Sequence, residues 1–355
     1  MVLPRRKFVK YFGLSFLGGK LPWPGGDADS ETRFLRNENL ETLVNGYKGN
    51  PFANGRFMNA GMANTDKSFG QVLGWFLSPN PQKEEKEKEN YQIPVHPLDQ
   101  TSVTQDCIIW LGHASFLIRL NGKWILTDPC LTAPPFQKRF TALPLPIEKI
   151  RADYILISHG HYDHLDSESM EKLNGQGTTV LAPLRMKKLL EKMNSDVHIQ
   201  EAGWYQVYQI DESFKISFLP AQHWYLRVPW DRNKILWGSF MIETPEKKIY
   251  FAGDTGYAPH FSELGKLFPG IDYALMPIGA YKPPGIMRGN HTDPEEAVRA
   301  FNELGAKTFI PMHFGTFDLA DEPRGEPIRW LKELNEQGKL DGQLKLPDLG
   351  EPVLI

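Results

Sequence analysis

Short apolar runs separated by turn-forming residues dominate the chain after residue 95. Residues 107–110, 115–120 and 123–127 are rich in β-branched and other bulky apolar side chains, and Asn121 and Gly122 between the last two runs favour a hairpin turn. The three runs therefore predict successive antiparallel strands.

Strands and helices alternate through the rest of the chain. The pattern predicts helices over residues 167–173 and 184–193 and further strands over residues 154–157, 179–182, 214–219 and 249–252. Strands this apolar must be covered on both faces, because neither face offers polar side chains to water. We therefore predict an α/β fold in which two sheets pack together with helices outside both, a four-layered αβ/βα sandwich with an N-terminal arm.

The composition of the first hundred residues differs from that of the rest. Residues 26–80 are rich in Gly, Asn and Pro with scattered bulky apolar side chains, which predicts an extended arm held against the core rather than a separate domain. The mixed-charge run over 83–89 is typical of a solvated helix face or a linker. We therefore divide the chain into an N-terminal segment (1–25), an arm with a charged linker (26–100) and a main domain (101–355).

The first 25 residues have features of a targeting segment. Arg5, Arg6 and Lys7 precede a short apolar stretch over 11–19, and this arrangement resembles a twin-arginine export signal. The alternative is a basic surface arm, because the segment lacks an Ala-x-Ala cleavage site. The first interpretation predicts a periplasmic protein and the second a cytoplasmic one.

Composition excludes several classes of protein. With 41% hydrophobic and 23% charged residues over 355 positions, the chain is of the soluble globular type and not disordered or collagen-like. A net charge of −3 gives no broad basic face, which argues against nucleic acid as a partner. No apolar run reaches the roughly 18 residues of a spanning helix. Cys107 and Cys130 are too few for a disulfide framework, and we expect both thiols to be buried.

A dense cluster of metal-ligand side chains follows the apolar run at 154–157. His159, His161, Asp163 and His164 fall within six positions. Imidazole nitrogen and carboxylate oxygen are ligands that borderline ions such as Zn²⁺ prefer, and a tight turn can aim alternate side chains at two adjacent ions. The alternative is a surface histidine cluster without a ligand. A strand exit is where catalytic groups collect, so we favour a dinuclear metal site.

Three further candidate ligands have the same placement. His223, Asp254 and His313 each follow an apolar, strand-like run, and one edge of a sheet can bring such positions together. His113, in the segment WLGHA at 110–114, is predicted to be a structural group that supports the site. The remaining histidines outside this context are predicted to be ordinary surface or loop residues: His96, His198 and His260.

These motifs together resemble a known superfamily. The HxHxDH cluster, a later His, an Asp in a GDTG turn and a final His are similar to the pattern of the metallo-β-lactamase superfamily. The resemblance implies that the main domain (101–355) is a hydrolase domain of that fold that uses metal-activated water. It leaves the substrate open, because one fold supports many reactions.

A finer resemblance covers residues 50–325. Ten segments are similar to the N-acyl-phosphatidylethanolamine-hydrolysing phospholipase D family: GRF (55–57), WLGHA (110–114), LTDP (126–129), ISHGHYDHLD (157–166), QHW (222–224), LWGS (236–239), FAGDTGY (251–257), PIGAY (277–281), HTDPEEA (291–297) and HFGTF (313–317). That family cleaves the phosphodiester bond between phosphatidate and an N-acylethanolamine. The resemblance implies a phospholipid substrate, a peripheral membrane surface as a partner, and a homodimer.

The resemblance also implies roles for individual residues. Two Zn²⁺ ions are expected, with other divalent transition metals left open; the first would be held by His159, His161 and His223, the second by Asp163, His164 and His313, with Asp254 between them. His291 is similar to a non-ligand histidine that orients the phosphate or donates a proton to the departing alkoxide, so the expected catalytic residues are His291, Asp163 and Asp254. The alternative for His291 is a role in capping or packing. Asp293 is predicted to be the N-cap of a helix that begins near Pro294.

A lipid substrate requires an apolar surface near the metal site. Residues 75–77 and 281–287 are candidates, and Lys282 and Arg288 could meet anionic headgroups; the alternative is ordinary packing of the arm and loops. The loop over 131–145 matches no family segment, which leaves acyl-chain preference open. Two competing hypotheses remain: a soluble hydrolase of another ester or lactone, and a non-catalytic metal-binding protein, which the complete ligand set disfavours.

Overall fold

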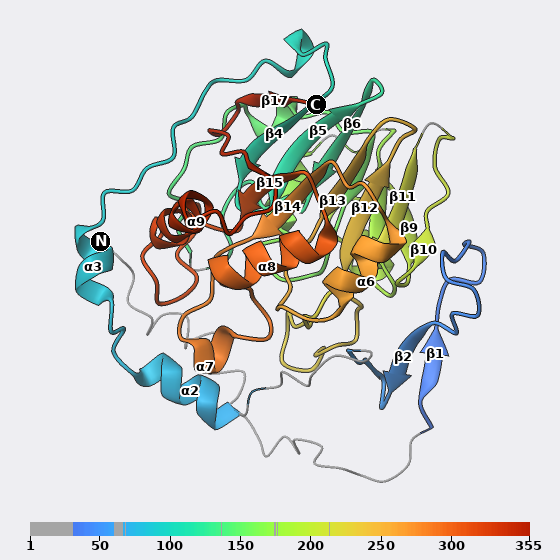
Figure 1. Ribbon diagram of the computed structural model, residues 1–355. Helices are drawn as coiled ribbons and strands as arrows, with labels where there is room; N and C mark the ends of the chain where they lie inside the picture. Colours follow the sequence, from blue (N-terminus) through green and yellow to red (C-terminus); the bar gives the residue numbers. More distant parts are fainter. Residues whose placement is uncertain are drawn as a thin grey trace.

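Two β-sheets packed face to face form the centre of the protein (Figure 1). The computed structural model describes residues 31–59, 67, 69–135, 137–173, 175, 177–212 and 214–355. The segment that resembles an export signal lies outside the described residues.

The first sheet has seven strands in the order β17-β4-β5-β6-β7-β8-β9. Pairing is antiparallel from β17 to β6 and parallel from β6 to β9. The strands are β4 (Cys107–Gly112), β5 (Ser115–Leu120), β6 (Lys123–Thr127), β7 (Tyr154–Leu156), β8 (Thr179–Pro183), β9 (His198–Ala202) and β17 (Pro352–Leu354). All residues of β4 and β7 are buried, so the apolar runs do mark strands covered on both faces.

The second sheet has the order β10-β11-β12-β13-β14-β15-β16 and is also mixed. Its antiparallel part runs from β10 to β13 and its parallel part from β13 to β16. The strands are β10 (Gln206–Val207), β11 (Lys215–Leu219), β12 (Ser239–Glu243), β13 (Lys248–Phe251), β14 (Tyr273–Pro277), β15 (Thr308–Met312) and β16 (Gln343–Leu344).

Helices cover the sheets and confirm the predicted αβ/βα sandwich. Helices α6, α8 and α9 lie along the outside of the second sheet in Figure 1, and α8 contacts both of the others. The helices of the main domain are α4 (Ser167–Lys172), α5 (Lys187–Leu190), α6 (His260–Leu267), α7 (Pro284–Met287), α8 (Pro294–Leu304) and α9 (Glu326–Glu336), with short 3₁₀ turns η1 (Gln100–Ser102) and η2 (Ile147–Lys149). Within the described part of the chain, no helix is long and apolar enough to cross a bilayer. Cys107 and Cys130 are buried free thiols, as predicted.

One predicted helix is wrong in its extent. The sequence predicts a helix over 184–193, but α5 covers only Lys187–Leu190. Arg185 has a φ of 71°, a left-handed conformation that interrupts a right-handed helix. The backbone N–H of Leu184 donates to the Ala202 carbonyl at 3.0 Å, so this residue prolongs the pairing of β8 with β9 instead.

The N-terminal arm contains regular elements that the sequence does not predict. A small sheet is formed by β1 (Arg33–Leu35), β2 (Asn50–Ala53) and β3 (Arg56–Phe57), and two helices follow, α2 (Phe69–Leu77) and α3 (Lys83–Lys88). Phe52 and Phe57 are buried, with ring centroids 5.0 Å apart. The side chain of the buried Asn50 accepts a hydrogen bond from the Trp204 backbone N–H at 3.1 Å, which ties the arm to the main domain.

The mixed-charge run is a helix with one anchored face. The ammonium group of Lys86 pairs with Asp318 and donates to the Ala320 carbonyl at 2.6 Å. The Glu89 carboxylate, just beyond α3, accepts from the Gly325 N–H at 3.0 Å. The run is therefore only partly solvated and clamps the arm to the segment before α9.

The prediction that His260 is an ordinary surface or loop residue is wrong. His260 is the first residue of α6, is 2% exposed, and its ring packs on Phe261 with centroids 4.0 Å apart. The helical spacing to Leu264, which is also buried, places both on the inner face of α6. That spacing was the signal in the sequence. His96 and His198 are exposed, as predicted.

We predict that His260 makes the protein sensitive to acid. Burial lowers the pKa of His260 to about 3, so the folded protein keeps this ring neutral while the unfolded chain protonates it below about pH 6.5. The contribution of the neutral His260 ring to the free energy of unfolding is therefore fully present above pH 6.5 and is lost as the pH falls towards 3. The unfolding free energy of the wild type should fall relative to that of His260→Gln by up to about 1.4 kcal/mol per pH unit between pH 6 and 4. Parallel curves from urea titrations of the two proteins would contradict this prediction.

Candidate metal centre

The predicted ligands meet at one edge of the sandwich because their strands end there. Strands β11, β13 and β15 run in the same direction within the second sheet, so the loops that follow them emerge at the same edge. These loops carry His223, Asp254 and His313. The loop after β7 in the first sheet brings the HxHxDH cluster to the same edge. Candidate ligand atoms from the two sheets lie close enough there to share one metal ion.

Three imidazoles and one carboxylate form the first group. The His161 Nδ1 atom lies 2.9 Å from His159 Nε2 and 3.1 Å from His223 Nε2. Asp254 Oδ2 lies 4.0 Å from His159 Nε2 and 3.8 Å from His223 Nε2. Ligand nitrogens around a tetrahedral Zn²⁺ are roughly 3.3 Å apart. The group therefore has the donor types and spacing that suit one divalent ion.

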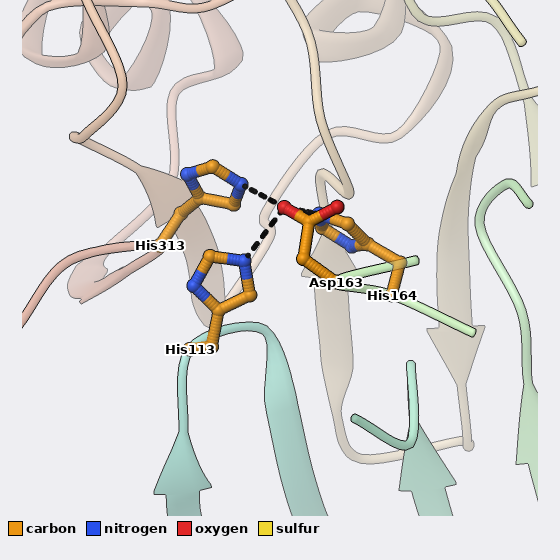
Figure 2. Close-up of side chains that lie close together, drawn as sticks. All are labelled: His113, Asp163, His164 and His313. Atoms are coloured by element: carbon orange, nitrogen blue, oxygen red, sulfur yellow. Dashed lines mark hydrogen bonds and ion pairs between the residues drawn. The ribbon is translucent and has the colours of Figure 1, made fainter. Parts of the chain in front are cut away.

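The second group has two imidazoles and two carboxylates. Asp254 Oδ1 lies 3.2 Å from His164 Nε2 and 3.0 Å from His313 Nε2. Asp163 Oδ2 lies 3.6 and 3.5 Å from the same two nitrogens. Figure 2 shows His113, His164 and His313 arranged around the Asp163 carboxylate. The structure thus brings all seven predicted ligands together in two adjoining groups.

Asp254 connects the two groups. Its Oδ2 atom faces the first group and its Oδ1 atom the second, and the residue is 2% exposed. Among the described residues, no group donates a well-aligned hydrogen bond to either oxygen, and the nearest nitrogens belong to the surrounding imidazoles. A buried carboxylate without a donor is costly unless a cation compensates it, so the residues present fit a pair of divalent ions.

Without a cation, protonated histidines balance the two carboxylates. Burial alone would lower the pKa of His313, but the negative charges of Asp254 and Asp163 outweigh it and raise that pKa to about 9. The same opposition raises the pKa of His164 well above its ordinary value. Burial lowers the pKa of His159 far below its ordinary value, which leaves a neutral donor ring. Loading the second group with a metal therefore displaces protons.

A buried carboxylate that the sequence analysis did not single out supports both groups. Asp128 Oδ2 lies 2.7 Å from His164 Nδ1 and accepts from the Ser158 hydroxyl at 2.5 Å. The same hydroxyl lies 2.9 Å from His159 Nδ1. Such partners fix the tautomer and ring orientation of a ligand histidine. The signal for Asp128 was the LTDP segment, which places an aspartate at the exit of β6 just as the ligands lie at other strand exits.

His291 lies over the junction of the two groups. Its Nδ1 atom is 3.6 Å from Asp254 Oδ2, and its ring centroid is 5.2 Å from that of His223 and 5.5 Å from that of His313. The side chain is 15% exposed, and burial lowers its pKa to about 4. Asp293 caps α8 as predicted, since its carboxylate accepts from the Glu296 N–H at 2.8 Å. Asp293, and not His291, therefore caps α8, and the imidazole of His291 faces the centre.

The N-terminal arm also reaches the centre. The side-chain amide of Asn59 donates to the backbone carbonyl of His223 at 3.0 Å. Its Oδ1 atom is buried and has no partner among the described residues. This contact could not be predicted, because nothing in the local sequence pattern places residue 59 beside residue 223.

The candidate lipid-binding segments are partly packed. The Trp75 indole N–H donates to Asp321 at 3.2 Å, while Leu77 is 69% exposed. Lys282 pairs with Glu326 at 2.5 Å and Arg288 pairs with Glu296 at 2.8 Å. Packing therefore accounts for Trp75, and both cations already have carboxylate partners.

An aromatic side chain packs against the first group. The ring of Trp224 meets His161 edge-on with centroids 4.9 Å apart, and the guanidinium of Arg232 lies 4.8 Å from the Trp224 ring.

Comparison with known proteins identifies related chains. Residues 123–314, just over half of the chain, match the β-lactamase superfamily domain. An uncharacterized protein of Mycobacterium tuberculosis is 35% identical over 262 residues, which cover 68% of this chain and 67% of that protein. N-acyl-phosphatidylethanolamine-hydrolyzing phospholipase D 1 of Caenorhabditis elegans is 30% identical over 282 residues, 73% of this chain and 79% of the worm protein.

A solved structure shows the same fold. Igni18, a metallo hydrolase from Ignicoccus hospitalis, superposes with a TM-score of 0.55 at 24% identity, covering 71% of this chain and 99% of Igni18. The matched family segment contains all seven predicted ligands, while Asn59 and His113 lie outside it.

Proposed function

This chain belongs to the metallo-β-lactamase superfamily and is a metal-dependent hydrolase, and on that premise we propose that it is a phosphodiesterase of the phospholipase D type. Its proposed substrate is N-acyl-phosphatidylethanolamine or a related glycerophospholipid, cleaved to phosphatidate and an N-acylethanolamine. The worm enzyme, a relative at 30% identity, carries that activity in its name.

The observation that carries the proposal is the position of Asp254. Its two oxygens face two separate groups of imidazole and carboxylate donors, so one residue sets the spacing of two cation positions. The chemistry that a pair of divalent ions, Zn²⁺ in our proposal, supplies in such a site is Lewis acidity, which lowers the pKa of water and neutralises charge on a phosphoryl group. A phosphodiester requires both effects, because its phosphorus is shielded by negative oxygens.

The other residues of the centre would hold the metal ions or act on the substrate. Asp163 and Asp254 supply the negative charge that holds the second cation position, and Asp128 keeps the His164 ring aimed at it. His291 is partly exposed above the junction, so its imidazole can reach a substrate oxygen. Because burial keeps this ring neutral near pH 7, we propose that its N–H orients the phosphate or donates a hydrogen bond to the departing alkoxide.

Exposed apolar side chains on α2 support the choice of a phospholipid. Val72 and Leu77 of α2 are 39% and 69% exposed, and α2 lies beside α7 in Figure 1 and contacts it. Helix α7 ends at Met287, whose carbonyl accepts from the His291 N–H at 3.2 Å. We call the surface formed by α2 and α7 the α2–α7 lip, and we propose that it rests on the bilayer and brings the headgroup to the centre. The homodimer expected from the sequence stays a prediction.

Product analysis tests the proposed function. The purified chain is incubated with phosphatidylcholine vesicles containing N-acyl-phosphatidylethanolamine, with a chelated sample alongside, and products are identified by mass spectrometry. Phosphatidate and N-acylethanolamine, absent from the chelated sample, are expected. Free fatty acid or diacylglycerol would assign the cleavage to a different bond, and turnover of a soluble lactone without any lipid product would favour the competing hydrolase.

We predict that His291→Ala keeps its metals and loses turnover. His291 lies close to Asp254 and His313 but is not one of the seven proposed ligands, so we expect metal content by elemental analysis to match that of the wild type. Loss of this N–H donor at the reacting phosphate should lower kcat by about a hundredfold or more. His198→Ala, at an exposed position, is the matched control. An unchanged kcat in His291→Ala would return this histidine to a packing role.

We predict that Leu77→Glu weakens vesicle binding. Burial of an exposed leucine in a bilayer interface contributes about 1.5 kcal/mol or more, so co-sedimentation affinity should fall about tenfold. Leu354→Glu, on β17 at the opposite end of the molecule in Figure 1 and 59% exposed, is the matched control and should bind as the wild type does. Equal binding by both variants and the wild type would remove the α2–α7 lip from the proposal.

A further inference from the structure

His113 occupies a position in the centre that neither the ligand set nor the proposed mechanism uses. Its Nε2 atom lies 3.2 Å from Asp163 Oδ2, within hydrogen-bond range, and Figure 2 shows the imidazole directed at that carboxylate. The residue is 1% exposed and lies in the turn between β4 and β5. It therefore approaches the second group from a different loop than any predicted ligand.

The backbone of His113 is held at both of its polar atoms. Its N–H donates to the Thr316 hydroxyl at 2.8 Å, and its carbonyl accepts from the Trp110 indole at 3.0 Å and from the His313 N–H at 3.2 Å. Its φ of 54° lies in the left-handed region, which is uncommon for a residue other than glycine. A backbone conformation of this kind persists where the surroundings over-determine it, as at a functional site.

Aromatic neighbours hold the imidazole ring of His113 with its Nε2 atom facing Asp163. One side of the imidazole packs on His313, with centroids 4.0 Å apart, and Phe317 meets it edge-on at 5.0 Å. These neighbours fix the plane of the ring. Because Asp163 is acceptor-only when ionised, the contact at 3.2 Å is a hydrogen bond in which His113 Nε2–H donates.

We propose that His113 is a positioning residue for the second cation position: its hydrogen bond to Asp163 Oδ2 fixes the orientation of that carboxylate relative to His164 and His313. The inference rests on the proposed dinuclear centre. It predicts an asymmetry, because no contact of this kind links His113 to the first group among the described residues. Loss of the donor should therefore weaken the second metal equivalent and leave the first unchanged.

Titration with Co²⁺ tests this inference. Metal-free wild type, His113→Phe and His113→Gln are titrated and followed by calorimetry and by the visible absorption of bound cobalt. His113→Phe keeps the packed ring without a donor, and we expect its second equivalent to bind about ten- to a hundredfold more weakly. His113→Gln keeps an N–H donor, so it should recover part of that affinity with the cobalt spectrum of the wild type.

Phe317→Leu is the matched control. It removes the ring on the far side of His113 but leaves the donor, and we expect it to bind both equivalents as the wild type does. If His113→Phe does not fold, Thr316→Val removes the hydroxyl that anchors the His113 N–H and should weaken the second equivalent by the same mechanism.

Three results would overturn the inference. They are an unchanged second equivalent in His113→Phe, equal weakening in His113→Phe and Phe317→Leu, and a changed cobalt spectrum in His113→Gln, which would make His113 a ligand. Failure of the wild type itself to bind two equivalents would instead remove the proposed dinuclear centre, so the two ideas fail in distinguishable ways.

Discussion

Asp254→Asn should abolish hydrolysis and remove at least one metal equivalent. The substitution keeps the shape of the side chain but removes the negative charge that faces both donor groups. One lost electrostatic contact in a catalytic site costs roughly a hundred- to a thousandfold in rate, and this change affects both cation positions, so we expect a loss at the upper end of that range or beyond it. Elemental analysis and kcat measured on the same preparation check the prediction.

The control for this variant is Asp348→Asn. Asp348 is a surface aspartate that pairs with the exposed His96 at 2.9 Å and does not belong to either donor group. It should keep wild-type activity and metal content. Two equivalents of metal and near-normal turnover in Asp254→Asn would show that the two groups do not share this carboxylate.

Chelation should abolish activity and lower the unfolding temperature. Metal bound at a thousand times its dissociation constant contributes about 4 kcal/mol, which corresponds to a decrease of roughly 5 °C in the unfolding temperature when the metal is removed from a chain of this size. Addition of Zn²⁺ should restore both properties. Thermal unfolding followed by circular dichroism, with and without the chelator, measures the change.

The metal-free protein should also lose stability as the pH rises. The pKa of His313 in the folded chain is raised to about 9, so its protonated form stabilises the neighbouring carboxylates fully below about pH 6.5 and this contribution is lost between that pH and about 9. In the metal-loaded protein these protons are already displaced, and the dependence in this range should be weaker. The same alkaline decline in both forms would show that His313 does not balance Asp254 and Asp163.

The strands and the ligand loops were predictable because each is encoded by a local pattern. The apolar runs that predict β4 to β8 lie within two residues of the observed strands, and the ligands follow such runs directly. Helix α5 was overestimated, because the left-handed backbone at Arg185 depends on its surroundings rather than on an unfavourable side chain.

The supporting residues were harder to predict because their roles depend on distant partners. Asp128 acts through His164, 36 positions away, and Asn59 through His223, 164 positions away. His260 was misjudged for a related reason: a single histidine gives no hint of burial unless its spacing to Leu264 on one helix face is considered. A sequence shows which groups can bind a metal more readily than it shows what holds them in place.

The wide separation of the donors along the chain has a consequence for biogenesis. The second group needs Asp163 and His164 from the first sheet and His313 from the far end of the second, so a nascent polypeptide that stops short of residue 313 has no complete cage. In the proposed dinuclear centre, the second ion could therefore bind only after the two sheets have docked.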